Sequence, residues 1–211
     1  MTEASKMLNL ARSTIPCRCH VCAFFGNPDE EYTVFLPFMK EGLAAGDRAV
    51  HIINKGHYEE RKRRLAEVGI SVRSAEQSGQ LEIRPWENAY LRSNCFDQYK
   101  MIELLEEVGA AGERQGSGFT RLWANMEWAL EDFPGTHDIV EYESRLNYVL
   151  PKYNMATVCT YDLAKFNAAV IMDIMRTHPQ VIIGGILQEN PFYVPPDEFL
   201  RELQNRKATA H

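Results

Sequence analysis

Apolar runs of strand length alternate with helix-patterned segments along most of the chain, which is typical of βαβ units and a mostly parallel sheet. The strand-length runs are almost continuously apolar, as expected for parallel strands that are buried on both faces. These predicted strands cover 20–25, 49–54, 81–84, 120–126, 156–161 and 181–183. Segments with helical spacing lie at about 29–46, 58–68, 74–78, 97–114, 137–149, 167–176 and 197–204. The pattern predicts an α/β fold class: a three-layer, doubly wound domain.

The length of 211 residues suits a single α/β core of good size. The chain contains no internal repeat and no low-complexity linker that would divide it. We expect an N-terminal extension over 1–19, one domain over 20–206 and a short tail over 207–211.

Charge and cysteine content exclude several classes of protein. The formal net charge is −6, and the densest basic run, 61–64, directly follows two glutamates, as on a solvated helix face. Because nucleic-acid binding needs clustered Lys and Arg, we expect no direct contact with nucleic acid. No apolar stretch approaches the roughly 20 residues that span a bilayer, and 1–13 lacks a signal-peptide core. The five cysteines are an odd number and three of them crowd into 17–22, so we expect a cytoplasmic protein with free thiols and no membrane association.

Open α/β sheets bind ligands in a crevice at the carboxyl ends of their strands. Aromatic and polar side chains follow several of the predicted strands at this edge. Aromatic walls with few polar groups suit a small, weakly polar molecule. The predicted ligand-binding residues at these ends are Phe25, Asn27, Asn54, Glu127, Tyr161 and Asp162, with Asn125 and Gly184-Gly185 nearby.

The first strand-to-helix turn, 26–32, lacks the chemistry of a phosphate loop. It reads GNPDEEY, with neither the lysine nor the Ser/Thr of a Walker motif. Asp29, Glu30 and Glu31 suit the helix dipole there but repel a polyphosphate. The strand at 120–126 is followed by Glu127, not by the aspartate that would support magnesium. We therefore expect no nucleotide cofactor and no ATPase activity.

A cysteine-rich entry to the first strand offers possible zinc ligands at Cys17, Cys19, His20 and Cys22. On an extended strand, His20 and Cys22 point to one side and Cys17 and Cys19 to the other. One ion cannot gather all four without a turn, and no second CxxC or HxxxH pair exists. We expect no metal site, with Cys22 a small core residue.

Several segments, in this order, resemble the MEDS family, the sensory domain of methanogen and methylotroph regulators that include dichloromethane-responsive repressors. They are HVCAFF at 20–25, FMKEGLAAGD at 38–47, EYESRLN at 141–147, CTYD at 159–162, THP at 177–179 and NPFYVPP at 190–196. The resemblance implies a RecA/KaiC-like core with a degenerate nucleotide site. It also implies sensing of simple hydrocarbon derivatives, often beside a kinase or DNA-binding domain. It adds His20 and Cys22 to the predicted ligand-binding residues and supports Tyr161 and Asp162.

The leading hypothesis is a non-catalytic small-molecule sensor in signal transduction or transcriptional control. The residues before His20 are too few for a helix-turn-helix, so we expect a separate signalling protein as partner. The sequence leaves open whether the chain also forms a homo-oligomer. One alternative is an enzyme of unknown class that uses Glu127, Asp162 and either His20 or His178 as acid/base groups. Another is a degenerate nucleotide-binding scaffold that assembles with an active homologue.

Overall fold

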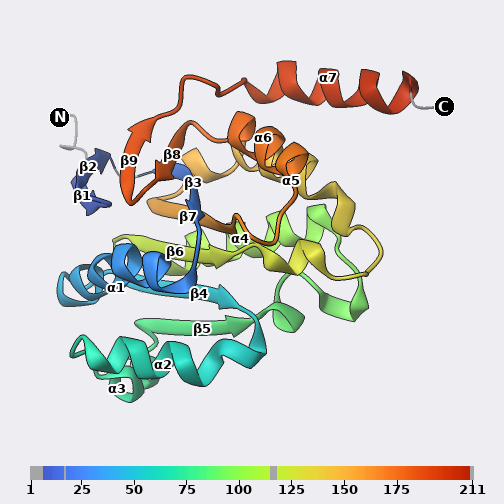
Figure 1. Ribbon diagram of the computed structural model, residues 1–211. Helices are drawn as coiled ribbons and strands as arrows, with labels where there is room; N and C mark the ends of the chain where they lie inside the picture. Colours follow the sequence, from blue (N-terminus) through green and yellow to red (C-terminus); the bar gives the residue numbers. More distant parts are fainter. Residues whose placement is uncertain (1–6, 17, 115–117, 210–211) are drawn as a thin grey trace.

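The fold centres on a seven-stranded sheet in a computed structural model that describes residues 7–16, 18–114 and 118–209 (Figure 1). The strand order is β5-β4-β6-β7-β3-β8-β9, and every neighbouring pair is parallel except β8 with β9. The strands are β3 (Cys19–Phe25), β4 (Arg48–Ile53), β5 (Leu81–Pro85), β6 (Thr120–Asn125), β7 (Met155–Asp162), β8 (Gln180–Ile183) and β9 (Ile186–Glu189). The predicted mostly parallel sheet is present, with all six predicted strands.

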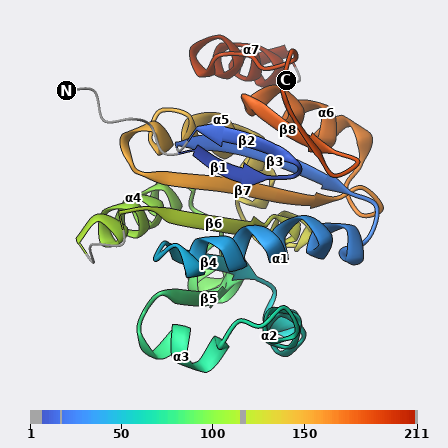
Figure 2. The same ribbon diagram turned by 90° about the vertical axis from the view of Figure 1, so that its left-hand side faces the viewer.

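Helices cover both faces of this sheet, which gives the predicted three layers (Figures 1 and 2). The α-helices are α1 (Pro28–Ala44), α2 (Tyr58–Glu67), α3 (Val72–Gln77), α4 (Gln98–Arg114), α5 (Ile139–Leu146), α6 (Ala168–Thr177) and α7 (Pro196–Thr209). Apolar residues of α1 and α2 pack on one face, and those of α4, α5 and α6 pack on the other. In the described part of the chain, no helix is both long enough and apolar enough to span a bilayer.

The strand β3 illustrates how the alternation of side chains builds two cores. All seven of its residues are buried. Val21, Ala23 and Phe25 belong to the core beneath α1, whereas Cys22 and Phe24 belong to the core beneath α5 and α6. Because successive side chains of a strand point to opposite faces, the even-numbered residues of β3 lie on the α5 face and the odd-numbered residues on the α1 face.

The chain also forms two short hairpins that the hydrophobic pattern does not predict. The strands β1 (Met7–Leu10) and β2 (Ser13–Pro16) form a separate two-stranded sheet, and β9 pairs antiparallel with β8. The strands β1, β2 and β9 have four residues each, and they lack the continuous apolar run by which the equally short β8 is recognised. The segment predicted as an N-terminal extension therefore contributes to the core, through Leu8, Leu10 and Ile15.

Candidate functional site

The two asparagines predicted to bind ligand at the strand ends act as helix caps. Asn27 Oδ1 accepts a hydrogen bond from Glu30 N at 3.0 Å, and Glu30 Oε2 accepts one from Gly26 N at 2.9 Å. This arrangement resembles a capping box at the start of α1. Asn54 Oδ1 accepts from Gly56 N at 2.7 Å and caps the 3-10 turn η1 (Lys55–His57). Both amides are thus engaged in local structure.

The remaining strand-end residues pack closely against their neighbours. Glu127, at the start of the 3-10 turn η4 (Glu127–Leu130), accepts a 2.5 Å hydrogen bond from Lys165 Nζ, which also lies 3.6 Å from Asp162. Phe25 is buried edge-to-face against Phe35. The cavity between these ends is only about 20 Å³, room for about one water molecule. A ligand of several atoms can enter only if these contacts open, and ligand binding by these residues stays a prediction.

Carboxylates occupy the place of a phosphate loop between β3 and α1. The Glu30 carboxylate accepts from the Gly26 amide, a backbone N–H of the kind that cradles phosphate in nucleotide-binding proteins. Glu31 Oε1 accepts from Trp123 Nε1 at 2.8 Å and from Thr160 Oγ1 at 2.9 Å. The carboxylates of Glu30 and Glu31 therefore lie in the loop where a nucleotide-binding protein of this fold would bind a polyphosphate.

A larger groove of about 430 Å³ lies at the carboxyl end of β8. Its walls are the β8–β9 turn, Gly184 and Gly185, one side of α1, and the β1–β2 turn, Ala11 and Arg12. All four turn residues have positive φ, between 48° and 71°. Glycine adopts this conformation freely, whereas alanine and arginine do so at a cost. The β1–β2 turn thus carries backbone strain at the edge of the groove.

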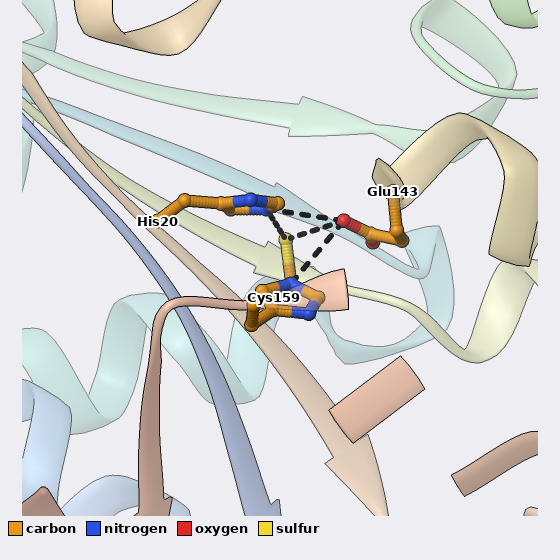
Figure 3. Close-up of side chains that lie close together, drawn as sticks. His20, Glu143 and Cys159 are labelled. Atoms are coloured by element: carbon orange, nitrogen blue, oxygen red, sulfur yellow. Dashed lines mark hydrogen bonds and ion pairs between the residues drawn. The ribbon is translucent and has the colours of Figure 1, made fainter. Parts of the chain in front are cut away.

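The most concentrated chemistry of the chain lies in a buried cluster, here called the His20 cluster, of His20, Glu143, Cys159 and His178. These side chains come from β3, α5, β7 and the loop between α6 and β8. Figure 3 shows the labelled His20, Glu143 and Cys159 side chains pointing toward one another. One ligand-type atom from each residue lies within 4.8 Å of the other three.

Neighbouring groups orient three members of the His20 cluster. His20 Nδ1 lies 3.2 Å from Asn147 Oδ1, and the Asn147 amide nitrogen donates to three backbone carbonyls, including that of Thr177 at 2.8 Å. His178 Nδ1 lies 2.9 Å from the carbonyl oxygen of Ile174. Both Nδ1 atoms therefore carry hydrogen, and both Nε2 atoms face the cluster. Glu143 Oε1 accepts from the Tyr161 hydroxyl at 2.7 Å, so Oε2 faces the cluster as well.

Burial and mutual interaction shift the pKa values inside the cluster. Burial lowers the pKa of His20, and the nearby His178 lowers it further. Burial also acts to lower the pKa of His178, but the side chains of Cys22, Cys159 and Glu143 raise it well above the usual 6.5. Burial would raise the pKa of Glu143, yet its interactions with His178 and His20 hold it well below its usual value. Burial raises the pKa of the Cys159 thiol. The shifts of His178 and Glu143 both favour the charged forms of these two side chains.

The predicted site residues thus separate into two groups. His20 belongs to the cluster, Tyr161 contacts its Glu143, and Cys22 lies beside it, paired in register with Cys159. The other predicted ligand-binding residues stay at the strand ends: Phe25, Asn27, Asn54, Glu127 and Asp162. Cys19 belongs to the opposite core, as its position on the strand predicts, and Cys17 lies outside the described residues.

Residues 19–179 match the family described as "MEDS: MEthanogen/methylotroph, DcmR Sensory domain". The chain belongs to the MEDS family. It is similar to the transcriptional repressor DcmR of Methylorubrum extorquens (strain DSM 6343 / CIP 106787 / DM4), with 31% identity over 165 residues. This similarity covers 75% of the chain and 57% of the repressor, so the MEDS chain spans little more than half of that relative.

A solved structure supports the fold of this MEDS domain. The KaiC-like protein PH0186 from the archaeon Pyrococcus horikoshii OT3 superposes with a TM-score of 0.58, over 79% of this chain and 71% of that one. Because the identity is 17%, the likeness concerns the fold alone. The predicted RecA/KaiC-like architecture is confirmed.

Sequence reasoning missed Glu143 and Cys159 as partners of the two histidines in this MEDS domain. All four residues lie within 19–179, and each falls in a segment that carries the family resemblance: HVC, EYESRLN, CTYD and THP. The occurrence of all four residues in these segments was the sequence signal from which the cluster could have been found. Residues 123 positions apart, such as His20 and Glu143, give no local spacing pattern from which a site can be read.

Proposed function

We propose that this chain is the non-catalytic sensory module of a transcription-regulating system, and that it binds a small, weakly polar molecule such as a simple hydrocarbon derivative. Membership of a sensory-domain family supports the regulatory role. The groove at the end of β8 carries the proposal of a binding site, because its roughly 430 Å³ suits a small ligand. The similarity to a repressor that is longer than the matched region supports a signalling partner, encoded separately or on a neighbouring domain.

The groove lies where doubly wound sheets place ligands, at the carboxyl end of a strand. Apolar surface from Val34 and Pro37 of α1 faces the backbone of Gly184 and Gly185, and Arg12 and Glu30 are the charged residues of its wall. About 200 Å² of apolar contact at roughly 25 cal/mol per Å² is worth about 5 kcal/mol before association costs. Binding is therefore expected to be micromolar or weaker, which suits a sensor of an abundant small molecule.

Strain at the β1–β2 turn supports a route from the groove to a partner. Ala11 and Arg12 hold positive φ at the groove wall, and the Ala11 carbonyl accepts a hydrogen bond from Leu187 N on β9 at 3.3 Å. Strained segments persist where the surrounding structure holds them, and they concentrate at switch regions. A ligand that contacts Arg12 can shift this hairpin relative to β9.

The catalytic alternative has less support from the placement of its acid/base groups. Glu127 and Asp162 are bound to Lys165, whereas His20 and His178 are buried beneath α5 on one face of the sheet. The nucleotide-scaffold alternative conflicts with Glu30 and Glu31 in the loop position. Calorimetry with ATP and magnesium is expected to detect no binding, and a measurable affinity would favour that alternative.

Amide NMR titration with short halogenated and oxygenated hydrocarbons, beginning with dichloromethane, tests the proposed binding site. The expected result is a saturable shift of the Gly184, Gly185 and Arg12 resonances. Thr33→Trp fills the groove from the exposed side of α1 and is expected to abolish the shift. Lys40→Trp is the matched control, because it places the same ring on α1 outside the groove. Equal shifts in both variants, or none in the unaltered chain, would refute the site.

A further inference from the structure

We propose that the His20 cluster is a closed, four-ligand site for a zinc-class divalent transition-metal ion, bound by His20 Nε2, His178 Nε2, Glu143 Oε2 and Cys159 Sγ. Imidazole, thiolate and carboxylate are the side chains that bind zinc in proteins. This site lies on the α5 face of the sheet, away from the groove, and its existence does not depend on the small-molecule proposal.

Four of the six distances between the ligand atoms lie at or near those of a tetrahedral ion. Zinc lies about 2.0–2.2 Å from nitrogen or oxygen and about 2.3 Å from sulfur, which places neighbouring ligand atoms roughly 3.3–3.8 Å apart. Glu143 Oε2 lies 3.1 Å from His20 Nε2 and 3.3 Å from His178 Nε2. Cys159 Sγ lies 3.6 Å from Glu143 Oε2 and 3.7 Å from His20 Nε2. All four ligand-type atoms, from four separate segments of the chain, lie within 4.8 Å of one another.

Hydrogen bonding satisfies these atoms only in part. Both histidines donate from Nδ1 to fixed carbonyl oxygens, so each Nε2 bears hydrogen only in an imidazolium. Two imidazolium rings with centroids 4.0 Å apart would repel strongly in a buried site. With a single imidazolium, on His178, the lone pair of His20 Nε2 lies 3.1 Å from the carboxylate oxygen, and the Cys159 thiol at 3.7 Å is its nearest donor. His178 Nε2 is fully buried without hydrogen-bond geometry to any partner among the described residues.

A divalent ion resolves this conflict because it accepts all four electron pairs. On binding, the Cys159 thiol and the imidazolium each release a proton to solvent. One dication, one thiolate, one carboxylate and two neutral imidazoles then sum to zero charge, which limits the cost of burial.

Second-sphere contacts have the form found at metal centres. Ligating histidines usually donate their other N–H to a carbonyl or carboxylate. Here His20 donates to Asn147, His178 donates to Ile174 O, and the Tyr161 hydroxyl donates to the second oxygen of Glu143. All four positions come from protein and all four residues are buried, so the site is structural and joins the sheet to the α5–α6 layer.

Cobalt substitution of the untagged full chain tests this site. After removal of metal with a chelator, one Co²⁺ per chain is expected to bind with visible bands of tetrahedral cobalt and a thiolate-to-cobalt charge-transfer band. One equivalent of Zn²⁺ should remove these bands. Cys159→Ser is expected to lose the charge-transfer band and at least 10-fold in affinity, whereas Asn147→Ala keeps the band and loses 10- to 100-fold in affinity.

Cys22→Ser is the matched control, because Cys22 is the buried neighbour of Cys159 in register and is not one of the proposed ligands. It is expected to keep the band. If Cys159→Ser does not fold, alkylation of the unaltered protein tests the site instead. Bound Zn²⁺ should slow the labelling of Cys159 at least 10-fold relative to the metal-free chain. Substoichiometric Co²⁺ binding, a band that survives in Cys159→Ser, or labelling indifferent to Zn²⁺ would overturn the proposal.

Discussion

The two faces of the sheet each bury charge, but in opposite ways. On the α1 face, Arg121 of β6 donates from Nε to Asp47 at 2.9 Å and from Nη1 to the Phe38 carbonyl at 2.7 Å. On the α5 face, the His20 cluster directs three nitrogen and oxygen atoms and a sulfur atom at one point. The first arrangement pairs a buried cation with acceptors, whereas in the second His178 Nε2 has no hydrogen-bond partner among the described residues.

This difference distinguishes a closed ion pair from a group of side chains that we propose to bind an ion. The segment 38–47, which carries part of the family resemblance, forms a socket for Arg121: Phe38 lies under the guanidinium, and a side chain at Gly42 would lie 2.4 Å from it. A closed pair of this kind holds a fold together and offers nothing to a ligand. The four ligand-type atoms of the His20 cluster, in contrast, are the groups that we propose to bind a metal ion. The following variants test the distinction, beginning with the largest expected effect.

Asp47→Asn is expected to lower the free energy of unfolding by about 3 kcal/mol, because it leaves the buried Arg121 cation without its closest carboxylate. The value lies at the low end for such pairs because Glu41 remains 3.6 Å from Nη2. Urea denaturation measures the change. Co²⁺ uptake by the folded protein should stay unchanged, and a parallel loss of metal binding would show that the two faces are coupled.

Tyr161→Phe is expected to destabilise the metal-free protein by about 2 kcal/mol, because a buried carboxylate loses a 2.7 Å hydrogen bond. Denaturant unfolding in a chelator measures this cost. In the presence of Zn²⁺ the same variant should also weaken metal binding 10- to 100-fold. Tyr142→Phe is the control, since its buried hydroxyl has no hydrogen-bond partner in the described part of the structure. Equal effects of the two variants would argue against a special role for the Glu143 contact.

Gly42→Ala is expected to cost about 1–2 kcal/mol, because the added methyl group would lie 2.4 Å from Cδ and Nε of Arg121. In the interior of a helix, replacing glycine by alanine normally raises the free energy of unfolding. A decrease would therefore indicate a steric conflict with Arg121. A double-mutant cycle with Arg121→Met provides the control. The loss of stability should largely disappear in the Arg121→Met background. An undiminished loss would show that the added methyl group does not act through contact with Arg121.

Glu202→Gln is expected to have the smallest effect, under about 1 kcal/mol, because its partners are partly solvated. Arg176, with help from Arg206, lowers the pKa of Glu202 from 4.5 to about 2. A depressed carboxyl pKa stabilises the folded state fully above pH 4.5, and this contribution disappears as the pH falls from 4.5 toward 2. The difference in unfolding free energy between the unaltered chain and the variant should therefore shrink between pH 6 and pH 3. A constant difference would refute the ion-pair explanation.

Several features of this protein follow from its sequence alone. Continuous apolar runs separated by helical spacing predict the six parallel strands, because burial on both faces imposes that pattern. The alternation of β3 assigns His20 and Cys22 to one face and Cys19 to the other. The absence of a lysine from 26–32 already indicates a degenerate nucleotide loop.

Tertiary structure decided which of the chemically active residues meet. The expectation of no metal site considered Cys17, Cys19, His20 and Cys22, which share one short segment, whereas His20 finds its partners 123, 139 and 158 positions away. The parallel order β7-β3-β8 brings those partners together, since it places Cys159 and the loop before β8 on either side of His20, and α5 covers all three. The hydrophobic pattern reports which face of an element is buried, but it carries no information about which distant element covers that face.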